Sequence, residues 1–473
     1  MLLREVQART LSGLTGIAEV VDELGARFQA AGEQLALVGG PVRDLMLGRL
    51  HNDLDFTTSA RPEVTDRLLE GWAEARWDIG RAFGTIGARR GRWQVEITTW
   101  RSEAYDPSSR KPAVEYGDSL AGDLGRRDFT VNAMAISLPG REFEDPFGGV
   151  VDLAERVLRT PGRPEDSFTD DPLRMMRAAR FAAQLGFTVD GAVVEAMRSM
   201  AERITIVSAE RVRDELVKLV SADQPVRGLR LLVETGLASY VLPELPTLAL
   251  ERDEHHRHKD VYEHTLTVLQ QAVDLEDRLP GGGPDFVARF AALMHDIGKP
   301  RTRRFLDDGT VTFHHHDVVG AKMTRKRMQA LRFSSDETDA VSKLVELHLR
   351  FHGYGSGEWT DSAVRRYVRD AGDQLGRLHV LTRADCTTRN RRKAERLRRT
   401  YDDLEARIER LSEEEELAGI RPALDGNQIM EILGIGPGPE VGKAYRHLLE
   451  LRLDHGPMSY DDARAALLEW AGR

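Results

Sequence analysis

Two aspartates, Asp53 and Asp55, stand on either side of a single leucine in a short stretch that alternates polar and apolar residues. If that stretch is a strand, residues two apart point to the same face, so the two carboxylates lie side by side. Neighbouring negative charges repel each other unless cations lie between them. Phosphoryl transfer uses such a pair, because two Mg²⁺ ions about 3.5–4 Å apart activate the attacking hydroxyl and stabilise the leaving group. An Asp-x-Asp pair alone is also common on solvated turns, so the surrounding sequence must decide.

A glycine-rich turn precedes this pair. Residues 39–44 read Gly-Gly-Pro-Val-Arg-Asp and follow directly on an apolar run, 35–38, that we expect to be a strand. Glycines at a strand-to-helix turn let backbone N–H groups approach a phosphate, and a helix N-terminus favours negative charge there. An arginine one turn into the helix could bind the same triphosphate. The pattern therefore predicts nucleotide contacts from Gly39, Gly40 and Arg43, whereas a Gly-Gly pair on its own would be an ordinary turn.

Glu96 is a candidate for a third catalytic carboxylate. It lies in a short apolar segment, 94–97, that we expect to be a strand. Val95 and Ile97 would then face the core, which places Glu96 on the opposite side. The alternative is a solvent-facing strand residue with no part in catalysis.

Around these motifs the sequence resembles the class II CCA-adding enzyme and bacterial poly(A) polymerase family, a branch of the polymerase-beta-type nucleotidyltransferases, over nearly the whole chain. The resemblance implies that Gly40 and Arg43 contact a triphosphate and that Asp53 and Asp55 bind Mg²⁺. Residues 126–133, Arg-Arg-Asp-Phe-Thr-Val-Asn-Ala, match the family motif that handles the sugar and phosphates. It implies nucleotide contacts from Arg127, Asp128 and Asn132. We expect Asp128 and Asn132 to share one face of a helix, because they are four residues apart.

The stretch 170–181 carries residues that could choose a base. After Pro172, which suits a first helical turn, an acidic residue and three arginines recur every three residues: Asp171, Arg174, Arg177 and Arg180. A carboxylate accepts from the exocyclic amine of cytosine or adenine, and a guanidinium donates to the adjacent ring nitrogen. Uracil and guanine present carbonyls instead, which leaves buried polar groups unpaired. In the family this motif reads C and A without a nucleic-acid template, which implies that role for Asp171 and Arg174, with Arg177 and Arg180 near the phosphates. The alternative is an ordinary helix with one i,i+3 ion pair, worth about 0.2–0.5 kcal/mol.

The segment 101–118 lies where the family carries a flexible loop. It contains Tyr105-Asp106 and Arg110-Lys111-Pro112. It follows the predicted strands of the head and precedes the 126–133 motif. In the family this loop is implied in moving from C to A addition, and enzymes that add only CC lack it. Its presence argues against a CC-only enzyme, although a plain polar loop would look the same.

A second constellation of histidines and aspartates follows further along the chain. Histidine and aspartate on facing helices can hold divalent metals, and a metal-bound water can attack a phosphoester. Residues 295–299 read His-Asp-Ile-Gly-Lys, and this motif resembles the HD phosphohydrolase superfamily. The resemblance implies that His264, Asp296 and Asp385 match the usual ligands, and that His316 and His348 match the additional ligands of two-metal versions. The predicted ligands are His264, His295, Asp296, His316, His348 and Asp385, for a second divalent metal such as Mn, Ni, Co or Fe. The alternative is an inactive scaffold with satisfied core histidines.

Two features near the C-terminus suit RNA binding. Residues 389–399 hold seven basic residues and one acidic residue. Residues 433–443 contain a Gly-Pro-Gly-Pro stretch that resembles the Pro-Gly-Pro turn in the tail of related enzymes. We expect both to bind the tRNA acceptor arm by shape and phosphate contacts. A structural turn beside a solvated charged face is the alternative.

Composition sets the remaining limits. A chain of 473 residues is too long for one hydrophobic core. Its single cysteine, Cys386, excludes an internal disulfide and fits a reducing compartment. The N-terminus has no apolar signal core, and no run reaches the roughly 20 apolar residues of a membrane span, so we expect a cytoplasmic protein with no membrane partner. The net charge of −10 does not exclude RNA binding, because a partner responds to the local potential rather than to the average charge. Of the 67 basic residues 58 are arginine, whose guanidinium groups can bind phosphates and base edges.

We therefore expect an α+β protein: a polymerase-beta-like nucleotidyltransferase α/β head followed by an all-helical neck, HD body and tail. The expected parts are an N-terminal helix packed on the head (1–34), the head (35–155), the neck (156–248), the HD domain (249–388) and the tail (389–473). The predicted activity is addition of C, C and A to tRNA from CTP and ATP. Alternatives are a poly(A) polymerase or A-adding enzyme, an HD metallophosphohydrolase, and a non-catalytic RNA-binding scaffold. The sequence does not predict the oligomeric state.

Overall fold

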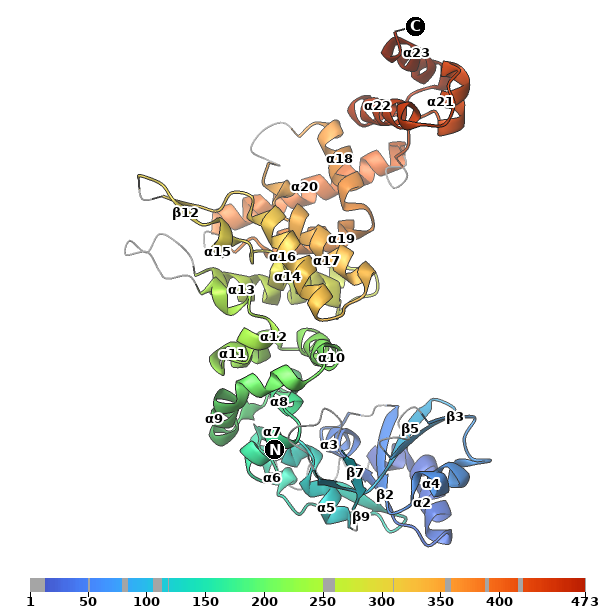
Figure 1. Ribbon diagram of the computed structural model, residues 1–473, viewed down its shortest axis with the longest axis vertical. Coiled ribbons are helices and arrows are strands. Elements are labelled where there is room, and N and C mark those ends of the chain that lie inside the picture. Colours follow the sequence, from blue (N-terminus) through green and yellow to red (C-terminus); the bar gives the residue numbers. More distant parts are fainter. Residues whose placement is uncertain are drawn as a thin grey trace. The chain divides into compact units, whose positions relative to one another are not determined.

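The computed structural model describes residues 13–49, 52–78, 84–104, 113–117, 119–249, 260–308, 310–353, 359–387, 391–415 and 420–472. The chain forms two compact units, Met1–Pro243 and Glu244–Arg473 (Figure 1). The first unit contains the only large sheet in the described part of the chain, and the second is built mainly of helices. This confirms the expected α+β class.

A seven-stranded sheet with the order β3-β4-β5-β2-β1-β8-β9 forms the head. Strands β2 and β5 are parallel, and the other neighbours are antiparallel. Apolar side chains on one face of β2 and β5 are buried, whereas the polar residues between them lie on the other face. The strands are β1 (Leu35–Val38), β2 (Asp53–Thr58), β3 (Ala75–Trp77), β4 (Thr85–Arg90), β5 (Trp93–Thr99), β8 (Ala135–Leu138) and β9 (Glu142–Glu144).

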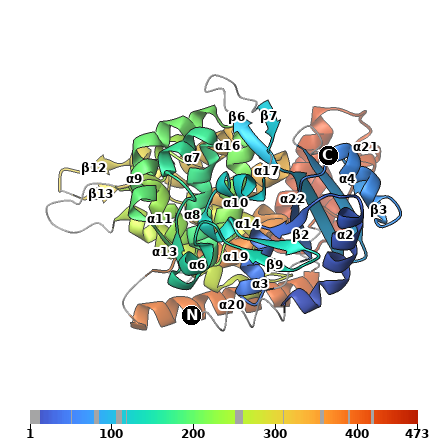
Figure 2. The ribbon, with the colours of Figure 1, turned by 90° about the horizontal axis from the view of Figure 1, so that it is seen from below.

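Helices pack against this sheet, and Figure 2 shows α2 and α4 beside its strands. Within the helix predicted over 1–34, residues 13–16 are helical and α2 spans Ala18–Ala30, whereas residues 1–12 lie outside the described residues. Helix α2 buries Val21, Leu24 and Phe28. The other helices of the head are α3 (Gly40–Met46), α4 (Pro62–Leu69), α5 (Leu120–Gly125), η2 (Thr130–Asn132) and α6 (Gly149–Glu155).

Strands β6 (Arg101–Ala104) and β7 (Ala113–Tyr116) pair with each other outside the large sheet. They form a separate antiparallel hairpin, which projects at the top of Figure 2. This hairpin occupies the segment where a loop was expected. The residues named there, Tyr105-Asp106 and Arg110-Lys111-Pro112, lie outside the described residues.

The neck is a stack of helices around α8, which packs against both α10 and α11. Gly228 on α11 allows this closeness, because a Cβ atom there would lie 2.5 Å from the carbonyl oxygen of Ala179 on α8. The neck is not entirely helical, since β10 (Val157–Leu158) and β11 (Thr188–Val189) form a short parallel pair. Its helices are α7 (Pro164–Asp170), α8 (Leu173–Leu185), α9 (Gly191–Met200), η3 (Ala201–Ile206), α10 (Ala209–Val220), α11 (Pro225–Glu234) and α12 (Ala238–Val241).

In the second unit, α13, α14, α17 and α19 pack together, and α16 lies against α17. One short antiparallel ribbon, β12 (Arg304–Phe305) and β13 (Val311–Thr312), interrupts the helices. The body comprises η4 (Pro246–Leu248), α13 (Val261–Asp274), η5 (Glu276–Arg278), α14 (Phe286–Met294), α15 (Lys299–Thr302), α16 (His316–Ala330), α17 (Ser335–Leu347), η6 (Arg350–Gly353), α18 (Asp361–Ala371), η7 (Gly372–Gln374) and α19 (Leu375–Ala384).

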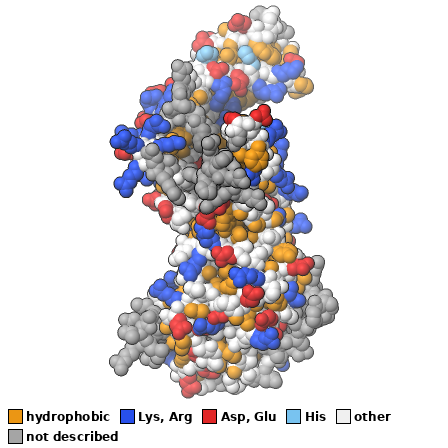
Figure 3. Space-filling view, turned by 90° about the vertical axis from the view of Figure 1, so that its left-hand side faces the viewer, with side chains coloured by type: hydrophobic (Ala, Val, Ile, Leu, Met, Phe, Trp, Pro, Cys, Tyr) orange, Lys and Arg blue, Asp and Glu red, His pale blue; other side chains and the backbone are white. Residues whose placement is uncertain are grey.

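A long helix, α20 (Arg391–Glu415), leads to the tail helices α21 (Gly426–Leu433), α22 (Pro439–His455) and α23 (Tyr460–Trp470). The described part of the predicted basic run forms the first turns of α20, and the glycine-proline stretch joins α21 to α22. No described helix is both long and apolar enough to cross a bilayer. On the face drawn in Figure 3, basic and acidic side chains are interspersed, so the net charge of −10 is not gathered into one acidic field there.

Candidate active site and metal centre

Asp53 and Asp55 lie at the start of β2, on the face opposite the buried Leu54 and Phe56. In the parallel pairing of β2 with β5, Asp55 is in register with Glu96, so the three carboxylates share one face. The carboxylate of Asp55 is accessible but closely surrounded by protein atoms, and this loss of water raises its pKa to about 6. Arg127 opposes that shift, whereas Glu96 and Asp53 add to it. The mutual repulsion of these carboxylates is the condition under which a divalent cation binds favourably.

The glycine turn lies directly beside the carboxylates. Gly39 has a φ of +73°, and a Cβ atom there would lie 2.9 Å from Nη1 of Arg127 and 3.9 Å from Oδ2 of Asp55. A side chain at this position would therefore close the space between the turn and the carboxylate pair. A cleft of about 200 Å³ opens here, lined by Gly40, Pro41, Asp44, Leu45, Arg49, Asp53, Leu54 and Asp55. The structure thus brings together the glycine turn, the aspartate pair and Arg127.

A chain of hydrogen bonds connects the glycine turn to the neck. Nη1 of the buried Arg43 donates to Oδ1 of Asn132 at 2.6 Å, and Nδ2 of Asn132 donates to Oδ1 of Asp128 at 3.0 Å. Nε of Arg177, on α8, donates to Oδ2 of Asp128 at 2.7 Å. Burial alone would raise the pKa of Asp128, but Arg177 and Asn132 hold it at about 2. Asp128 is therefore an ionised carboxylate that joins the head to the neck.

The helix expected to carry Asp128 and Asn132 is not formed, so that expectation was wrong. Residues Thr130–Asn132 form a single 3₁₀ turn, because Phe129 is extended with φ −136° and ψ 150°. The carboxylate of Asp128 instead accepts from the backbone N–H of Phe129 at 2.8 Å. The two side chains still meet, but through this turn rather than along a helix face.

The residues predicted to read the base recur every three positions in the sequence, but each has a different partner in the structure. Asp171 lies between α7 and α8, and its carboxylate accepts from Nη2 of Arg211 at 2.7 Å. Arg174 is buried and donates to Oγ of Ser167 at 2.9 Å and to the carbonyl oxygen of Arg126. Asp171 and Arg174 are therefore not an ordinary i,i+3 ion pair.

Arg180 differs from its neighbours on α8 in its partners. Its Nε donates to Oε2 of Glu215 at 2.6 Å, and its Nη1 donates to Oε1 of Gln184 at 2.9 Å. In this structure the guanidinium is thus held within the neck, by α10 and by its own helix.

Phe181, which the sequence marked only as the end of the motif, lies at the centre of these arginines. Its ring centroid is 4.0 Å from Cζ of Arg180, 5.3 Å from Cζ of Arg43 and 5.7 Å from Cζ of Arg177. It also packs edge-to-face on Phe129 of the head at 5.8 Å. One buried ring therefore contacts three guanidiniums predicted to bind a nucleotide. Its position four residues after Arg177, and so on the same helix face, was the one signal in the sequence.

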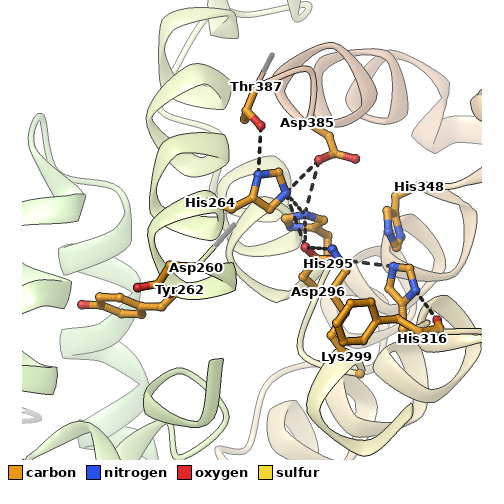
Figure 4. Close-up of polar contacts among 12 residues, drawn as sticks. Asp260, Tyr262, His264, His295, Asp296, Lys299, His316, His348, Asp385 and Thr387 are labelled. Carbon is orange, nitrogen blue, oxygen red and sulfur yellow. Dashed lines mark hydrogen bonds and ion pairs between the residues drawn. The ribbon is translucent and has the colours of Figure 1, made fainter. Parts of the chain in front are cut away.

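The second constellation gathers all six predicted ligands in the body (Figure 4). They form two groups with ligand atoms within 4.8 Å of one another: His264, His295 and Asp385, and Asp296, His316 and His348. Asp296 connects the groups, because its Oδ2 is 3.2 Å from Nε2 of His295 and its Oδ1 is 3.3 Å from Nε2 of His316. The absence of a side chain at Gly298 allows His316 to lie this close to Asp296, since a Cβ atom at residue 298 would lie 2.1 Å from the carbonyl oxygen of His316.

The Nδ1 atom of each of the four histidines already has a polar partner in the protein. Nδ1 of His295, His316 and His348 faces the carbonyl oxygens of Ala292, Phe313 and Val345 at 2.8, 2.8 and 2.6 Å, and Nδ1 of His264 faces Oγ1 of Thr387 at 3.1 Å. A proton on Nδ1 leaves a lone pair on Nε2, the form that metals bind. Nε2 of His348 is buried without a hydrogen-bond partner among the described residues, and burial lowers the pKa of this histidine to about 4. The residues therefore fit a divalent metal centre.

This fold and these sites define a nucleotidyltransferase whose second unit carries the histidines and aspartates of an HD-type domain. Residues 35–159 match the family described as Poly A polymerase head domain, residues 186–248 that described as probable RNA and SrmB-binding site of polymerase A, and residues 261–390 the HD domain. The A-adding tRNA nucleotidyltransferase of Deinococcus radiodurans is 35% identical over 92% of this chain and 95% of its own. The CC-adding tRNA nucleotidyltransferase of Thermus thermophilus is 32% identical over 92% and 93%. The chain belongs to the family of CCA-adding enzymes and related tRNA nucleotidyltransferases and poly(A) polymerases.

Two further comparisons concern enzymes named for CCA addition. The CCA-adding enzyme of Bacillus velezensis is 40% identical over 46% of this chain and 53% of its own. A crystal structure of the Bacillus stearothermophilus CCA-adding enzyme in complex with CTP superimposes with a TM-score of 0.62 over 95% of this chain and 96% of that chain, at 24% identity. The structural likeness shows the fold.

Proposed function

We propose that this protein adds C, C and A to the 3′ end of tRNA from CTP and ATP. The observation that carries the proposal is the carboxylate face of Asp53, Asp55 and Glu96 beside the glycine turn and Arg127. The 3′-hydroxyl of the tRNA attacks the α-phosphorus, a new P–O bond forms, and the bond to the β-phosphate oxygen breaks to release pyrophosphate. Mg²⁺ bound by Asp53 and Asp55 would activate the hydroxyl and neutralise the departing pyrophosphate. Gly39, Gly40, Arg43 and Arg127 would hold the triphosphate.

We infer that Asp171 and Arg174 choose the base by hydrogen bonding to the edges of cytosine and adenine. The pair of Asp171 with Arg211 is partly exposed, so an exocyclic amine can replace the guanidinium at little cost. Arg174 is already fixed by Ser167 and Arg126, which leaves its orientation independent of the nucleotide. Asp128 and Asn132 would contact the ribose, and Arg177 and Arg180 the phosphates. The division into N-terminal helix (1–34), head (35–155), neck (156–248), HD domain (249–388) and tail (389–473) is part of the same proposal.

Addition of A alone, to a tRNA that already ends in CC, is the second candidate. The 35% identity with the A-adding enzyme of Deinococcus radiodurans favours it. The hairpin β6–β7 lies at the place of the loop implied in the change from C to A addition, which supports either candidate over a CC-only enzyme.

The test supplies tRNA lacking its last three nucleotides, and separately tRNA ending in CC, with CTP and ATP alone and together. Products are read at single-nucleotide resolution. CCA addition predicts two additions with CTP alone and a third that requires ATP. An enzyme that extends only the CC-ended tRNA by one A would replace the first proposal with the second, and an unlimited adenylate ladder would contradict both.

Replacing Phe181 with leucine should raise the KM for CTP and ATP about tenfold with a smaller change in kcat, because the aromatic face that holds three guanidiniums is lost. The KM for tRNA should stay the same. Phe168→Leu is the matched control, because Phe168 is a fully buried phenylalanine of α7 in the same unit. If both variants lower thermal stability and change kcat and the KM values for CTP, ATP and tRNA alike, Phe181 has no positioning role.

We propose that the second centre binds two divalent ions and hydrolyses phosphoesters at RNA or nucleotide ends. Purified protein loaded with Mn²⁺, Ni²⁺ or Co²⁺ should retain about two ions per chain after gel filtration, and Asp296→Asn should lose at least one, because Asp296 serves both groups. Elemental analysis measures this directly. His447→Ala is the control, since His447 lies in the tail helix α22. Equal metal content in all three proteins, or none in the unaltered chain, would contradict the proposal.

A further inference from the structure

The ribbon β12–β13 lies beside the proposed second metal centre, the group formed by His264, His295, Asp296, His316, His348 and Asp385. It lies between Asp296 and His316, and Figure 1 shows it projecting from the body. At its base, the carbonyl oxygen of Phe313 is 2.8 Å from Nδ1 of His316. The Phe313 ring centroid is 5.8 Å from Nζ of Lys299, which binds Oδ2 of Asp296 at 2.6 Å. The ends of the ribbon are therefore attached to two of the predicted metal ligands.

The ribbon exposes apolar side chains to solvent. Phe305 is 65% exposed and Leu306 is 50% exposed, and among the described large apolar side chains Phe305 has the highest exposed fraction. The guanidinium of Arg303 lies over the Phe305 ring, with Cζ 4.6 Å from the centroid. An exposed aromatic ring backed by an arginine contributes little to a core. It is the kind of surface on which a nucleobase stacks.

The charge around this ring is positive. Four of the six residues 299–304 are basic. Lys299 binds Asp296, whereas Arg301, Arg303 and Arg304 have no carboxylate partner in the part of the chain that the structure describes. Between the two strands, the carboxylate of Asp308 accepts from the backbone N–H of Thr310 at 2.8 Å, so this acidic group already has a partner. The unpaired guanidiniums suit the phosphates of a nucleic-acid backbone.

We propose that the ribbon β12–β13 binds the end of a single-stranded RNA, stacking a base on Phe305 and holding the adjacent phosphate with Arg301, Arg303 or Arg304. The ribbon would thereby deliver the terminal phosphoester to the second metal centre. This inference rests on the proposed phosphohydrolase activity of that centre. It names the substrate class as an RNA end with a base, rather than a free phosphate ester.

Photocrosslinking tests binding without depending on metal or turnover. A dinucleotide carrying 4-thiouridine and a 3′-phosphate is irradiated with the full chain in a chelator, and adducts are located by mass spectrometry. We expect an adduct on the peptide containing Phe305, reduced about tenfold by Phe305→Ala. Phe143→Ala, which removes a 44% exposed phenylalanine from the head, is the matched control. Adducts only elsewhere, or an undiminished adduct on the ribbon of Phe305→Ala, would overturn the proposal.

A kinetic comparison separates this inference from the activity it rests on. The metal-loaded chain is given a dinucleotide 2′,3′-cyclic phosphate or glycerol 1,2-cyclic phosphate, which has the same reacting group but no base. Phe305→Ala should raise the KM for the dinucleotide about tenfold and leave that for the glycerol ester unchanged. Equal changes for both esters would overturn the role of the ribbon. Hydrolysis of neither ester by the unaltered chain would overturn the phosphohydrolase proposal, while the crosslink would still test the ribbon.

Discussion

Replacement of Asp53 or Asp55 by asparagine is expected to lower incorporation of CMP and AMP by on the order of a thousandfold or more, because the lost charge is the one that holds the metal ions. Asparagine keeps the shape of the side chain and the strand, so the effect should be confined to chemistry. Burial removes water from the carboxylate of Asp55, and Glu96 and Asp53 add negative charge beside it, so its pKa is raised to about 6. A cation relieves that crowding, and an amide does not attract one.

Single-turnover incorporation and tRNA affinity should respond differently in these variants. Incorporation should collapse, whereas the dissociation constant for tRNA should stay within about twofold, because the proposed tRNA contacts lie in other parts of the chain. Asp22→Asn is the matched control, since Asp22 pairs with Arg141 at the surface of the same head. Turnover retained by Asp53→Asn or Asp55→Asn, or an equal loss in Asp22→Asn, would remove the two-metal mechanism.

Replacement of Asp171 by alanine should lower the preference for CTP over UTP about a hundredfold, because uracil then no longer places a carbonyl against a carboxylate. Replacement of Arg174 by alanine should also lower the preference for CTP over UTP, because it removes the donor to the ring nitrogen. The measurement is kcat/KM for each of the four nucleotides on one tRNA. The loss should appear as faster use of the wrong nucleotide as well as slower use of the right one.

Arg211→Ala gives this prediction its control. It removes the ion pair that Asp171 makes in the structure but leaves the carboxylate in place. Discrimination should therefore persist in Arg211→Ala and disappear in Asp171→Ala. If the two variants lose discrimination equally, the role of Asp171 is to fix the neck through Arg211 and not to read a base.

The head could be predicted closely from local patterns. Alternation around Asp53 and Asp55 placed both on one strand face, and Val95 and Ile97 placed Glu96 on the polar side of β5. The register that puts Glu96 beside Asp55 could not be predicted, because it depends on which strands become neighbours. The helix expected at Asp128 failed for a local reason, since the extended Phe129 delays the turn until Thr130.

The hydrogen-bond partners of Asp171 and of the neck arginines could not be predicted from the sequence. Arg174 reaches the carbonyl oxygen of Arg126 across 48 residues, and Asp171 reaches Arg211 across 40. Spacing along one helix indicates which face a side chain occupies but not what the fold brings to that face. The position of Phe181 beneath three guanidiniums has the same origin, because Arg43 belongs to another element.

For the second centre, the candidate ligands could be predicted from the sequence but their arrangement could not. All six candidate ligands could be predicted from the resemblance of the spaced histidines and aspartates to the HD phosphohydrolase superfamily. Their grouping around Asp296, and the carbonyl oxygens that orient each imidazole, depend on how α14, α16 and α17 meet. The exposed ribbon beside them left no signal in the sequence strong enough to single out Phe305.

The central claim is that Asp53 and Asp55 gather divalent cations where a nucleoside triphosphate meets a tRNA end. Crystals of the chain grown with Mn²⁺ and a non-hydrolysable CTP analogue test it most directly, through the anomalous signal of manganese. Manganese is expected in contact with both carboxylates and with the phosphates of the analogue beside Gly39 and Gly40. Manganese found only among the histidines of the body, with the analogue bound away from the aspartates, would contradict it.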